Sequence, residues 1–181
     1  MKKKILSAAA ALAVIIIAIC LARAAMFKSK QITVEPATVT GIDQHAIAEN
    51  LSRAIQLKTI SHQDAAKFDG PTFFAFHRLL ERTFPRAHKT LAREIISKYS
   101  LLYTWKGQDR FARPILLLGH LDVVPSEYSQ ENSWTHDAFE GRIADGFIWG
   151  RGALDDKNAL LGCLEAVEGL LKREPRQERD E

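Results

Sequence analysis

Two short groups of polar residues carry side chains of the kinds that bind metal ions. The first is His120 and Asp122, which follow an apolar run from Ile115 to Leu118 and then Gly119. Such a run is typical of a strand that is buried on both faces of a parallel sheet. Residues two apart in an extended chain point to the same side, and a metal-bound imidazole usually donates its other ring N–H to a carboxylate. We therefore expect His120 and Asp122 to form a hydrogen-bonded pair at the carboxyl end of a buried strand, where open α/β sheets place their ligands.

The second group is Asp155 and Asp156, which follow Gly150 and Gly152 and precede a predicted helix that begins near Lys157. Glycines permit a close approach of the backbone to a ligand, and zinc accepts both imidazole and carboxylate ligands. Each group alone has an ordinary explanation, because His-x-Asp is common by chance and an aspartate pair often caps a helix. The combination of the two groups is more specific and predicts a metal site.

Three segments of the chain resemble a known enzyme family. GHLDVVP (119–125), the spacing W-x4-F-x-G (134–141) and DGFIWGRGALDDKN (145–158) are similar to the dizinc aminoacylase and carboxypeptidase family, which includes acetylornithine deacetylase and succinyl-diaminopimelate desuccinylase. The resemblance covers about residues 47–171. It is closest to the branch of carboxypeptidase S and the N-fatty-acyl-amino acid synthase/hydrolase. It implies an α/β fold, namely the N-terminal part of a zinc-peptidase-like catalytic domain with a central mixed, mostly parallel sheet and flanking helices.

The resemblance also implies roles for individual residues. His120 would be a ligand of one zinc ion, Asp155 would bridge two zinc ions, and Asp122 would be the catalytic residue that positions the imidazole of His120. The peptide bond between Asp155 and Asp156 is cis in the family. The two zinc ions, for which cobalt or manganese can substitute, would activate a water molecule for attack on an amide or peptide bond. The implied substrates are small molecules or peptides with a free carboxylate.

The family has further parts that we expect beyond Glu181. Its general base and one zinc ligand come from a Glu-Glu pair on the strand after the helix that begins near Lys157, and its dimerisation domain also follows. Glu165 and Glu168 fall on a predicted surface helix and are not expected to replace that pair. We therefore expect a fragment or truncated product of a hydrolase that binds zinc weakly, is inactive by itself and forms homodimers only at full length. The alternative is a non-catalytic, membrane-anchored remnant of such an enzyme.

Composition and charge exclude some other classes of function. The chain has 46% hydrophobic and 26% charged residues, as an ordinary folded domain does. Its net charge of +3 includes the basic residues around an N-terminal apolar segment, so no basic face predicts nucleic-acid binding. Cys20 and Cys163 lie in an apolar segment and in a predicted helix, which argues against a disulfide framework.

The N-terminal apolar segment, Ile5 to Ala22, follows three lysines. As a helix it would span about 27 Å, close to the hydrocarbon thickness of a bilayer. The lysines favour a cytoplasmic N-terminus and an extracytoplasmic catalytic part, periplasmic or extracellular, whereas cleavage as a signal peptide would make the protein secreted. The predicted domains are 1–26 as anchor or signal, 27–42 as linker, 43–172 as the metallopeptidase part and 173–181 as a disordered charged tail.

The remaining patterns predict the elements that position the two polar groups. Hydrophobic periodicity predicts three helices, Gln44 to Leu57, Pro71 to Phe84 and Lys157 to Leu171. Leu91 to Ile96 and Leu101 to Lys106 are predicted strands because of their β-branched and aromatic content. Asp145-Gly146 between two apolar stretches predicts a tight hairpin, which would deliver Gly150 to Asp155 to the site.

Overall fold

The computed structural model of the chain describes residues 2–29, 33, 41–126 and 134–173. Contacts divide the chain into two units, Met1–Thr40 and Gly41–Glu181. Most of the expected linker, 27–42, and nearly all of the expected tail, 173–181, lie outside the described residues.

The first unit contains helix α1 (Lys2–Ala25), whose side chains are all exposed. The uninterrupted helix that was expected over residues 5–22 is confirmed. By length and composition α1 is able to cross a membrane, a test that the core helix of a soluble protein and a signal sequence also pass. A core helix would be largely buried and α1 is not, so its exposure favours a membrane anchor or a signal sequence.

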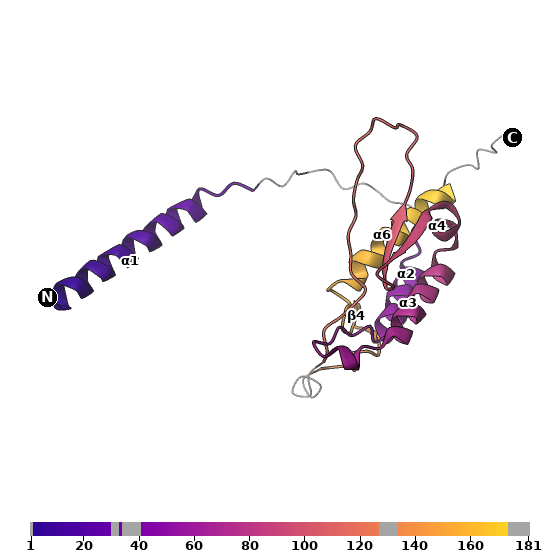
Figure 1. The fold of residues 1–181 in the computed structure, drawn as a ribbon, viewed down its shortest axis with the longest axis horizontal. Coiled ribbons are helices and arrows are strands. Elements are labelled where there is room, and N and C mark those ends of the chain that lie inside the picture. Colours follow the sequence, from indigo (N-terminus) through magenta and orange to yellow (C-terminus); the bar gives the residue numbers. More distant parts are fainter. Residues whose placement is uncertain (1, 30–32, 34–40, 127–133, 174–181) are drawn as a thin grey trace. The chain divides into compact units, whose positions relative to one another are not determined.

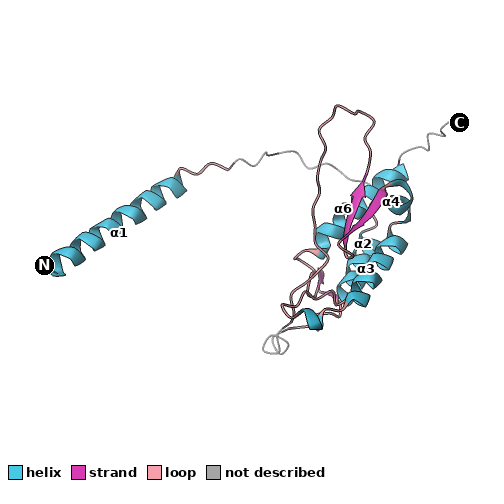
Figure 2. Ribbon diagram, in the orientation of Figure 1, coloured by secondary structure: helices cyan, strands magenta, loops and turns pink. Residues whose placement is uncertain are grey.

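Helices form the larger part of the regular secondary structure of the second unit, and Figure 2 shows them joined by long loops. Among the described residues they are α2 (Gln44–Gln56), α3 (Gly70–Thr83), α4 (Pro85–Thr90) and α6 (Lys157–Arg173), with a short 3-10 helix, η1 (Ala65–Lys67), before α3. Two aspartates cap α-helices: Asp43 accepts a hydrogen bond from the backbone N–H of Ala46 at 3.0 Å, and Asp69 accepts one from that of Thr72 at 3.3 Å. The three predicted helices are confirmed to within two residues at each end.

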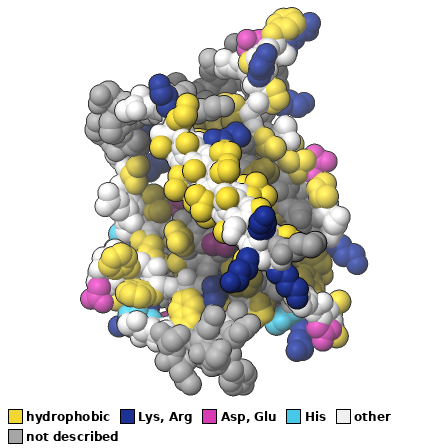
Figure 3. All heavy atoms as spheres, turned by 90° about the vertical axis from the view of Figure 1, so that its left-hand side faces the viewer, with side chains coloured by type: hydrophobic (Ala, Val, Ile, Leu, Met, Phe, Trp, Pro, Cys, Tyr) yellow, Lys and Arg dark blue, Asp and Glu magenta, His cyan; other side chains and the backbone are white. Residues whose placement is uncertain are grey.

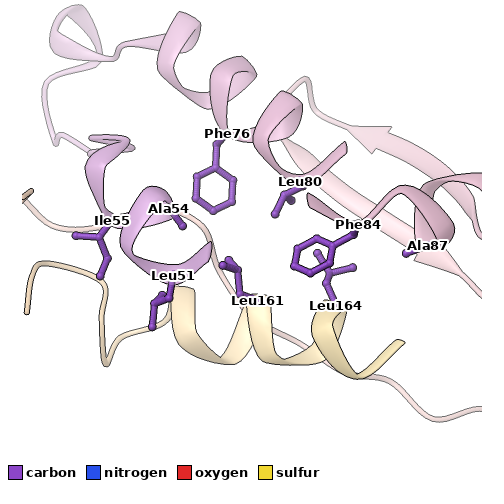
Figure 4. Packing of buried hydrophobic residues seen from close by; sticks show 9 residues of the cluster. All are labelled: Leu51, Ala54, Ile55, Phe76, Leu80, Phe84, Ala87, Leu161 and Leu164. Atoms are coloured by element: carbon purple, nitrogen blue, oxygen red, sulfur yellow. The ribbon is translucent and has the colours of Figure 1, made fainter. Parts of the chain in front are cut away.

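The main hydrophobic core lies where these helices pack together. Ile55 of α2 and Phe76 of α3 have no exposed surface, and Leu161 of α6 is 3% exposed. Figure 4 shows nine side chains of this cluster pointing toward one another: Leu51, Ala54, Ile55, Phe76, Leu80, Phe84, Ala87, Leu161 and Leu164. Burial of one Leu or Phe side chain stabilises a fold by about 1.5–3 kcal/mol, so this cluster is the main source of stability in the second unit.

Two antiparallel hairpins make up the described sheets. The paired strands are β1 (Ala92–Ile96) with β2 (Ser100–Thr104), and β3 (Ile143–Ala144) with β4 (Phe147–Ile148). Between β3 and β4, Asp145 and Gly146 have φ angles of 55° and 80°, the positive values that a two-residue type I′ turn requires. The two predicted strands and the predicted hairpin are therefore confirmed.

The expected central, mostly parallel sheet is not found among the described residues, whose sheets are the two hairpins. Ile115, Leu116, Leu117 and Leu118 are not in a strand, and their exposed fractions are 88, 73, 62 and 78%. The prediction of a buried strand here is wrong for this structure. A strand obtains its backbone hydrogen bonds and the burial of both faces from neighbours, and the described chain offers only one isolated parallel bridge beyond this segment, from Ile60 to Val123.

Figure 1 draws these residues as part of a long loop after β2. Hydrophobic side chains are coloured yellow in the space-filling view of Figure 3. The large apolar residues that are exposed include most of those of α1 and residues 115–118.

A smaller hydrophobic cluster packs around Val123, directly after the His-x-Asp motif. Ala138 and Phe139 are its other buried members, and Ile60 and Trp134 pack against it. Trp134 and Phe139, the two aromatic residues of the W-x4-F-x-G spacing, are thus packing residues.

Candidate metal centre

The segment that carries His120 is bonded to the residues that follow α2. The hydroxyl of Thr59, which has no exposed surface, donates to the carbonyl of Leu121 at 2.5 Å. The N–H of Val123 donates to the carbonyl of Thr59 at 2.9 Å, and the N–H of Ser61 donates to the carbonyl of Val123 at 2.9 Å. These three bonds fix the backbone on both sides of Asp122.

Asp122 holds the ring of His120 in one orientation. His120 Nδ1 lies 2.9 Å from the backbone carbonyl of Asp122 and 3.2 Å from its carboxylate oxygen Oδ1. The other carboxylate oxygen accepts a hydrogen bond from the hydroxyl of Ser61 at 2.5 Å. A proton on Nδ1 satisfies both acceptors, so Nε2 is the nitrogen that is left for a ligand. The expected contact between His120 and Asp122 is confirmed.

Asp155 meets the other side of the same ring. His120 Nε2 and Asp155 Oδ1 are 3.0 Å apart, although the two residues are separated by 35 positions in sequence. Two ligands of a tetrahedral zinc ion, each about 2.0 Å from the metal, are about 3.3 Å from each other. The structure therefore brings the two predicted metal ligands to within the distance that a shared ion requires. Both side chains are open to solvent, 49% and 88% exposed.

The loop from Gly150 to Asp156, here called the carboxylate loop, is shaped by glycine. Gly152 has a φ of 88°, and a side chain there would bring its Cβ to 2.9 Å from Val123 Cγ1. Asp156 Oδ2 accepts the backbone N–H of His120 at 3.2 Å, and its carbonyl accepts the N–H of Leu160 in α6 at 3.1 Å. The peptide bond between the two aspartates is cis, as expected.

Electrostatics at the site favour the protonated imidazole in the chain without metal. Burial lowers the pKa of His120, but hydrogen bonds to Asp155 and Asp122 and the charges of both carboxylates outweigh it, so the pKa of His120 is raised above its usual 6.5. A metal ion at Nε2 therefore has to replace a proton that Asp155 stabilises.

Lys157 is a buried residue beside the candidate site, and no role for it was predicted from the sequence. It has no exposed surface, and its ammonium donates to the carbonyls of Ala54 and Leu57 at 2.8 and 2.7 Å. Burial lowers the pKa of Lys157 to about 7, and the charge of Asp122 partly opposes that shift. Spacing could have revealed this burial, because Lys157 stands four and seven residues before Leu161 and Leu164 and therefore on the buried face of α6.

Glu165 and Glu168 lie on α6 and are engaged in contacts between helices. Glu165 accepts a hydrogen bond from Asn50 of α2 at 2.7 Å. Glu168 accepts the backbone N–H groups of Arg86 and Ala87, in the first turn of α4, at 3.1 and 2.8 Å. Each glutamate thus has a structural role, and Glu181 lies outside the described residues.

The donor set fits part of a zinc site. His120 and Asp155 supply the nitrogen and oxygen ligands that zinc accepts, and the imidazole has the oriented second nitrogen that zinc-binding histidines show. In the described ranges, no group of three or more His, Cys, Asp or Glu side chains is arranged to hold a metal ion. A catalytic zinc ion usually has three protein ligands, and His120 and Asp155 would supply two of them.

Comparison with known proteins gives the class first. Residues 116–180 match peptidase family M20/M25/M40, and the chain belongs to this family of metallopeptidases and amidohydrolases, whose members are generally metal-dependent. The family predicted from the three motifs is thereby confirmed.

Several individual relatives are similar to most of this chain. The probable carboxypeptidase S-like 2 of Dictyostelium discoideum is 44% identical over 155 residues, which are 81% of this chain and 30% of that protein. Carboxypeptidase S of Saccharomyces cerevisiae is 38% identical over 130 residues, 68% of this chain and 23% of the relative. The N-fatty-acyl-amino acid synthase/hydrolase of Mus musculus is 37% identical over 142 residues, 76% of this chain and 27% of the relative. The chain spans less than a third of the length of these relatives.

Proposed function

We propose that this chain is part of a metal-dependent hydrolase of amide or peptide bonds, of the carboxypeptidase or N-acyl-amino acid hydrolase type. The observation that carries the proposal is the approach of His120 Nε2 to Asp155 Oδ1 at 3.0 Å, with Asp122 at the opposite nitrogen of the ring. In a relative of carboxypeptidases, an oriented imidazole and a carboxylate that converge on one point match the needs of a metal-activated hydrolase.

Each residue of the site has a proposed part in the chemistry. His120 would bind a zinc ion through Nε2, and Asp155 would bind the same ion and a second one. Two bound zinc ions would supply Lewis-acid activation of a water molecule and of the amide carbonyl. Asp122 keeps the proton of the imidazole on Nδ1, which presents the lone pair of Nε2 to the metal. Asp156 holds the backbone N–H of His120 and so fixes the residue from its main chain.

The names of the relatives support the proposed substrate class, which is a small molecule or peptide with a free carboxylate. We place the second unit on the extracytoplasmic side of a membrane, anchored by α1, or secreted if α1 is removed as a signal sequence. In a protein of the relatives' full length, we propose a homodimer.

A second candidate is a non-catalytic, membrane-anchored remnant of such an enzyme. One observation favours it: the described residues bring together two metal-ligating side chains, where a catalytic zinc ion uses three. The two candidates differ in whether the site takes part in hydrolysis.

The test measures zinc binding and hydrolysis on the 181-residue chain in detergent and on the product of the complete reading frame that contains it. We expect the chain to bind zinc weakly and the longer product to hydrolyse N-acylated amino acids or dipeptides. His120→Ala should lower both zinc affinity and hydrolysis by at least about 100-fold, because it removes a ligand. Glu165→Gln, a carboxylate change on α6 outside the site, is the matched control and should leave both unchanged. A longer product that binds zinc but hydrolyses none of these substrates would favour the remnant.

A further inference from the structure

Lys157, the first residue of α6, carries a charged side chain with no exposed surface. Lysines are almost never fully buried unless their charge has partners. Here the partners are the carbonyls of Ala54 and Leu57, and the ammonium also lies 5.2 Å from the centroid of the Phe76 ring. Both carbonyls belong to the C-terminal end of α2, where the helix dipole places a partial negative charge. Each also accepts a backbone N–H: the carbonyl of Ala54 accepts that of Leu57 at 3.3 Å, and the carbonyl of Leu57 accepts that of Thr59 at 2.8 Å, so the ammonium is a second donor to each.

The same end of α2 also holds the histidine of the site. Residues 54–59, here called the α2 end segment, contact Lys157 through the carbonyls of Ala54 and Leu57. They contact Leu121 through the hydroxyl of Thr59. Lys157 stands two residues after Asp155, and Leu121 stands next to His120. One short segment therefore holds the two ligand-bearing parts of the chain in place relative to each other.

The stem of Lys157 supports the carboxylate loop as well. A Cβ placed on Gly152 would lie 3.1 Å from Lys157 Cδ, so the backbone of the loop packs directly on the lysine stem. The backbone N–H of Lys157 donates to the carbonyl of Gly152 at 3.1 Å and closes the loop. Movement of the lysine side chain would therefore move the loop that presents Asp155.

We propose that Lys157 is a positioning residue of the candidate metal centre, whose buried ammonium ties the carboxylate loop to the α2 end segment and so holds Asp155 at His120. This inference rests on the proposed function, since it assigns Lys157 to the site that would hold the metal. Lys157 acts through the place of Asp155, because its own nitrogen is occupied by the two carbonyls of α2.

The experiment compares variants of the whole 181-residue chain. Lys157→Met keeps the apolar stem and removes the three N–H donors, whereas Lys157→Gln keeps a stem with two amide donors. Leu164→Ala opens a cavity in the same helix and the same core, seven residues further along α6 than Lys157. Zinc affinity is measured by calorimetry, the geometry of the site by the visible absorption spectrum with bound Co²⁺, and folding by thermal denaturation.

We expect Lys157→Met to weaken zinc binding about tenfold and to alter the Co²⁺ spectrum, as the loss of a residue that orients ligands does. Lys157→Gln should weaken zinc binding about threefold, an intermediate effect, because it keeps two N–H donors. Leu164→Ala should lower the melting temperature while the zinc affinity and the spectrum stay those of the unaltered chain. A folded Lys157→Met chain that binds zinc within twofold of the unaltered chain would overturn the positioning role.

Failure of Lys157→Met to fold leaves the comparison to Lys157→Gln. Zinc binding weaker than that of Leu164→Ala by about threefold or more would support the role, and equal affinity would overturn it. If His120→Ala does not reduce the zinc binding of the chain, the proposed function is contradicted, and the role of Lys157 is contradicted with it.

Discussion

Phe76 and Leu116 are both large apolar residues of the second unit, yet their surroundings are opposite. Phe76 has no exposed surface in the helical core, whereas Leu116 is 73% exposed in the loop before His120. A helix makes its own backbone hydrogen bonds and needs only one packed face, which the neighbouring helices provide. The difference shows that the two halves of the candidate site have unequal support. Asp155 leads into the packed helix α6, whereas the segment that carries His120 is held by hydrogen bonds of Leu121 and Val123 with residues 59–61 and by that from the His120 N–H to Asp156.

The largest effect should come from the helical core. Phe76→Ala is expected to lower the free energy of unfolding by about 4 kcal/mol, because the lost side chain leaves a cavity among α2, α3 and α6. Urea denaturation of the chain measures it. Phe74→Ala, at a position of α3 that is 41% exposed, is the matched control and should cost far less. Equal losses at the two positions would break the contrast between buried and exposed residues.

A smaller effect is expected where the two regions are joined. Thr59→Val removes the hydroxyl that donates to the Leu121 carbonyl and should cost about 1.5 kcal/mol of unfolding free energy, since that carbonyl loses its donor. Hydrogen exchange of the Val123 amide should also become faster, because this N–H bonds to Thr59. Thr59→Ser, which keeps the hydroxyl, is the control for the exchange rate. Unchanged exchange in Thr59→Val would mean that the His120 segment has another support.

A surface ion pair gives a weaker, pH-dependent test of how the first hairpin is attached to the core. The hydrogen bond from Arg93 of β1 lowers the pKa of Glu81 of α3 from 4.5, and burial opposes this only in part. A carboxyl whose pKa is lowered by folding stabilises the fold above its unfolded pKa, and this contribution is lost as the pH falls through the lower, folded value. The free energy of unfolding of the unaltered chain should exceed that of Glu81→Gln by about 0.5 kcal/mol at neutral pH. In strong acid the two values should be equal. A difference that persists in strong acid would rule out the carboxylate charge as its cause.

The smallest effect is expected in the exposed segment. Leu116→Ser should change the unfolding free energy by less than about 0.5 kcal/mol, because a side chain that is 73% exposed loses little burial. The same urea titration measures it. A loss of several kcal/mol would show that residues 115–118 are buried in solution and would remove the contrast with Phe76.

The sequence was sufficient where structure is decided locally. Helix α3 follows from its apolar spacing and its proline start, and the β3–β4 turn follows from Asp145-Gly146, whose backbone needs are set by the two residues themselves. The closeness of His120 and Asp155 was predicted from the metal-binding side chains of the two polar groups taken together and from the resemblance to a family. No local pattern joins two residues that are 35 positions apart.

The sequence was insufficient where the local structure depends on contacts with distant segments of the chain. Four apolar residues from Ile115 to Leu118 were read as a buried strand, but burial depends on partner strands, and no such partners lie beside these residues in the part of the chain that the structure describes. The role of Lys157 was missed for a related reason. A lysine is ordinarily a surface residue, and only the packing of α2 against α6 shows that this ammonium meets two backbone carbonyls.

The two adjacent aspartates contact one histidine in two different ways. Asp155 contacts the imidazole of His120, and Asp156 contacts its backbone N–H. The number of residues between Gly152 and Lys157 is therefore tightly constrained. One inserted or deleted residue would break at least one of these two contacts and would also shift the start of α6. Over evolutionary time, insertions and deletions should be rejected in this stretch and accepted more readily in the exposed loop of residues 105–113. A change of length would thus be more damaging here than most changes of residue type.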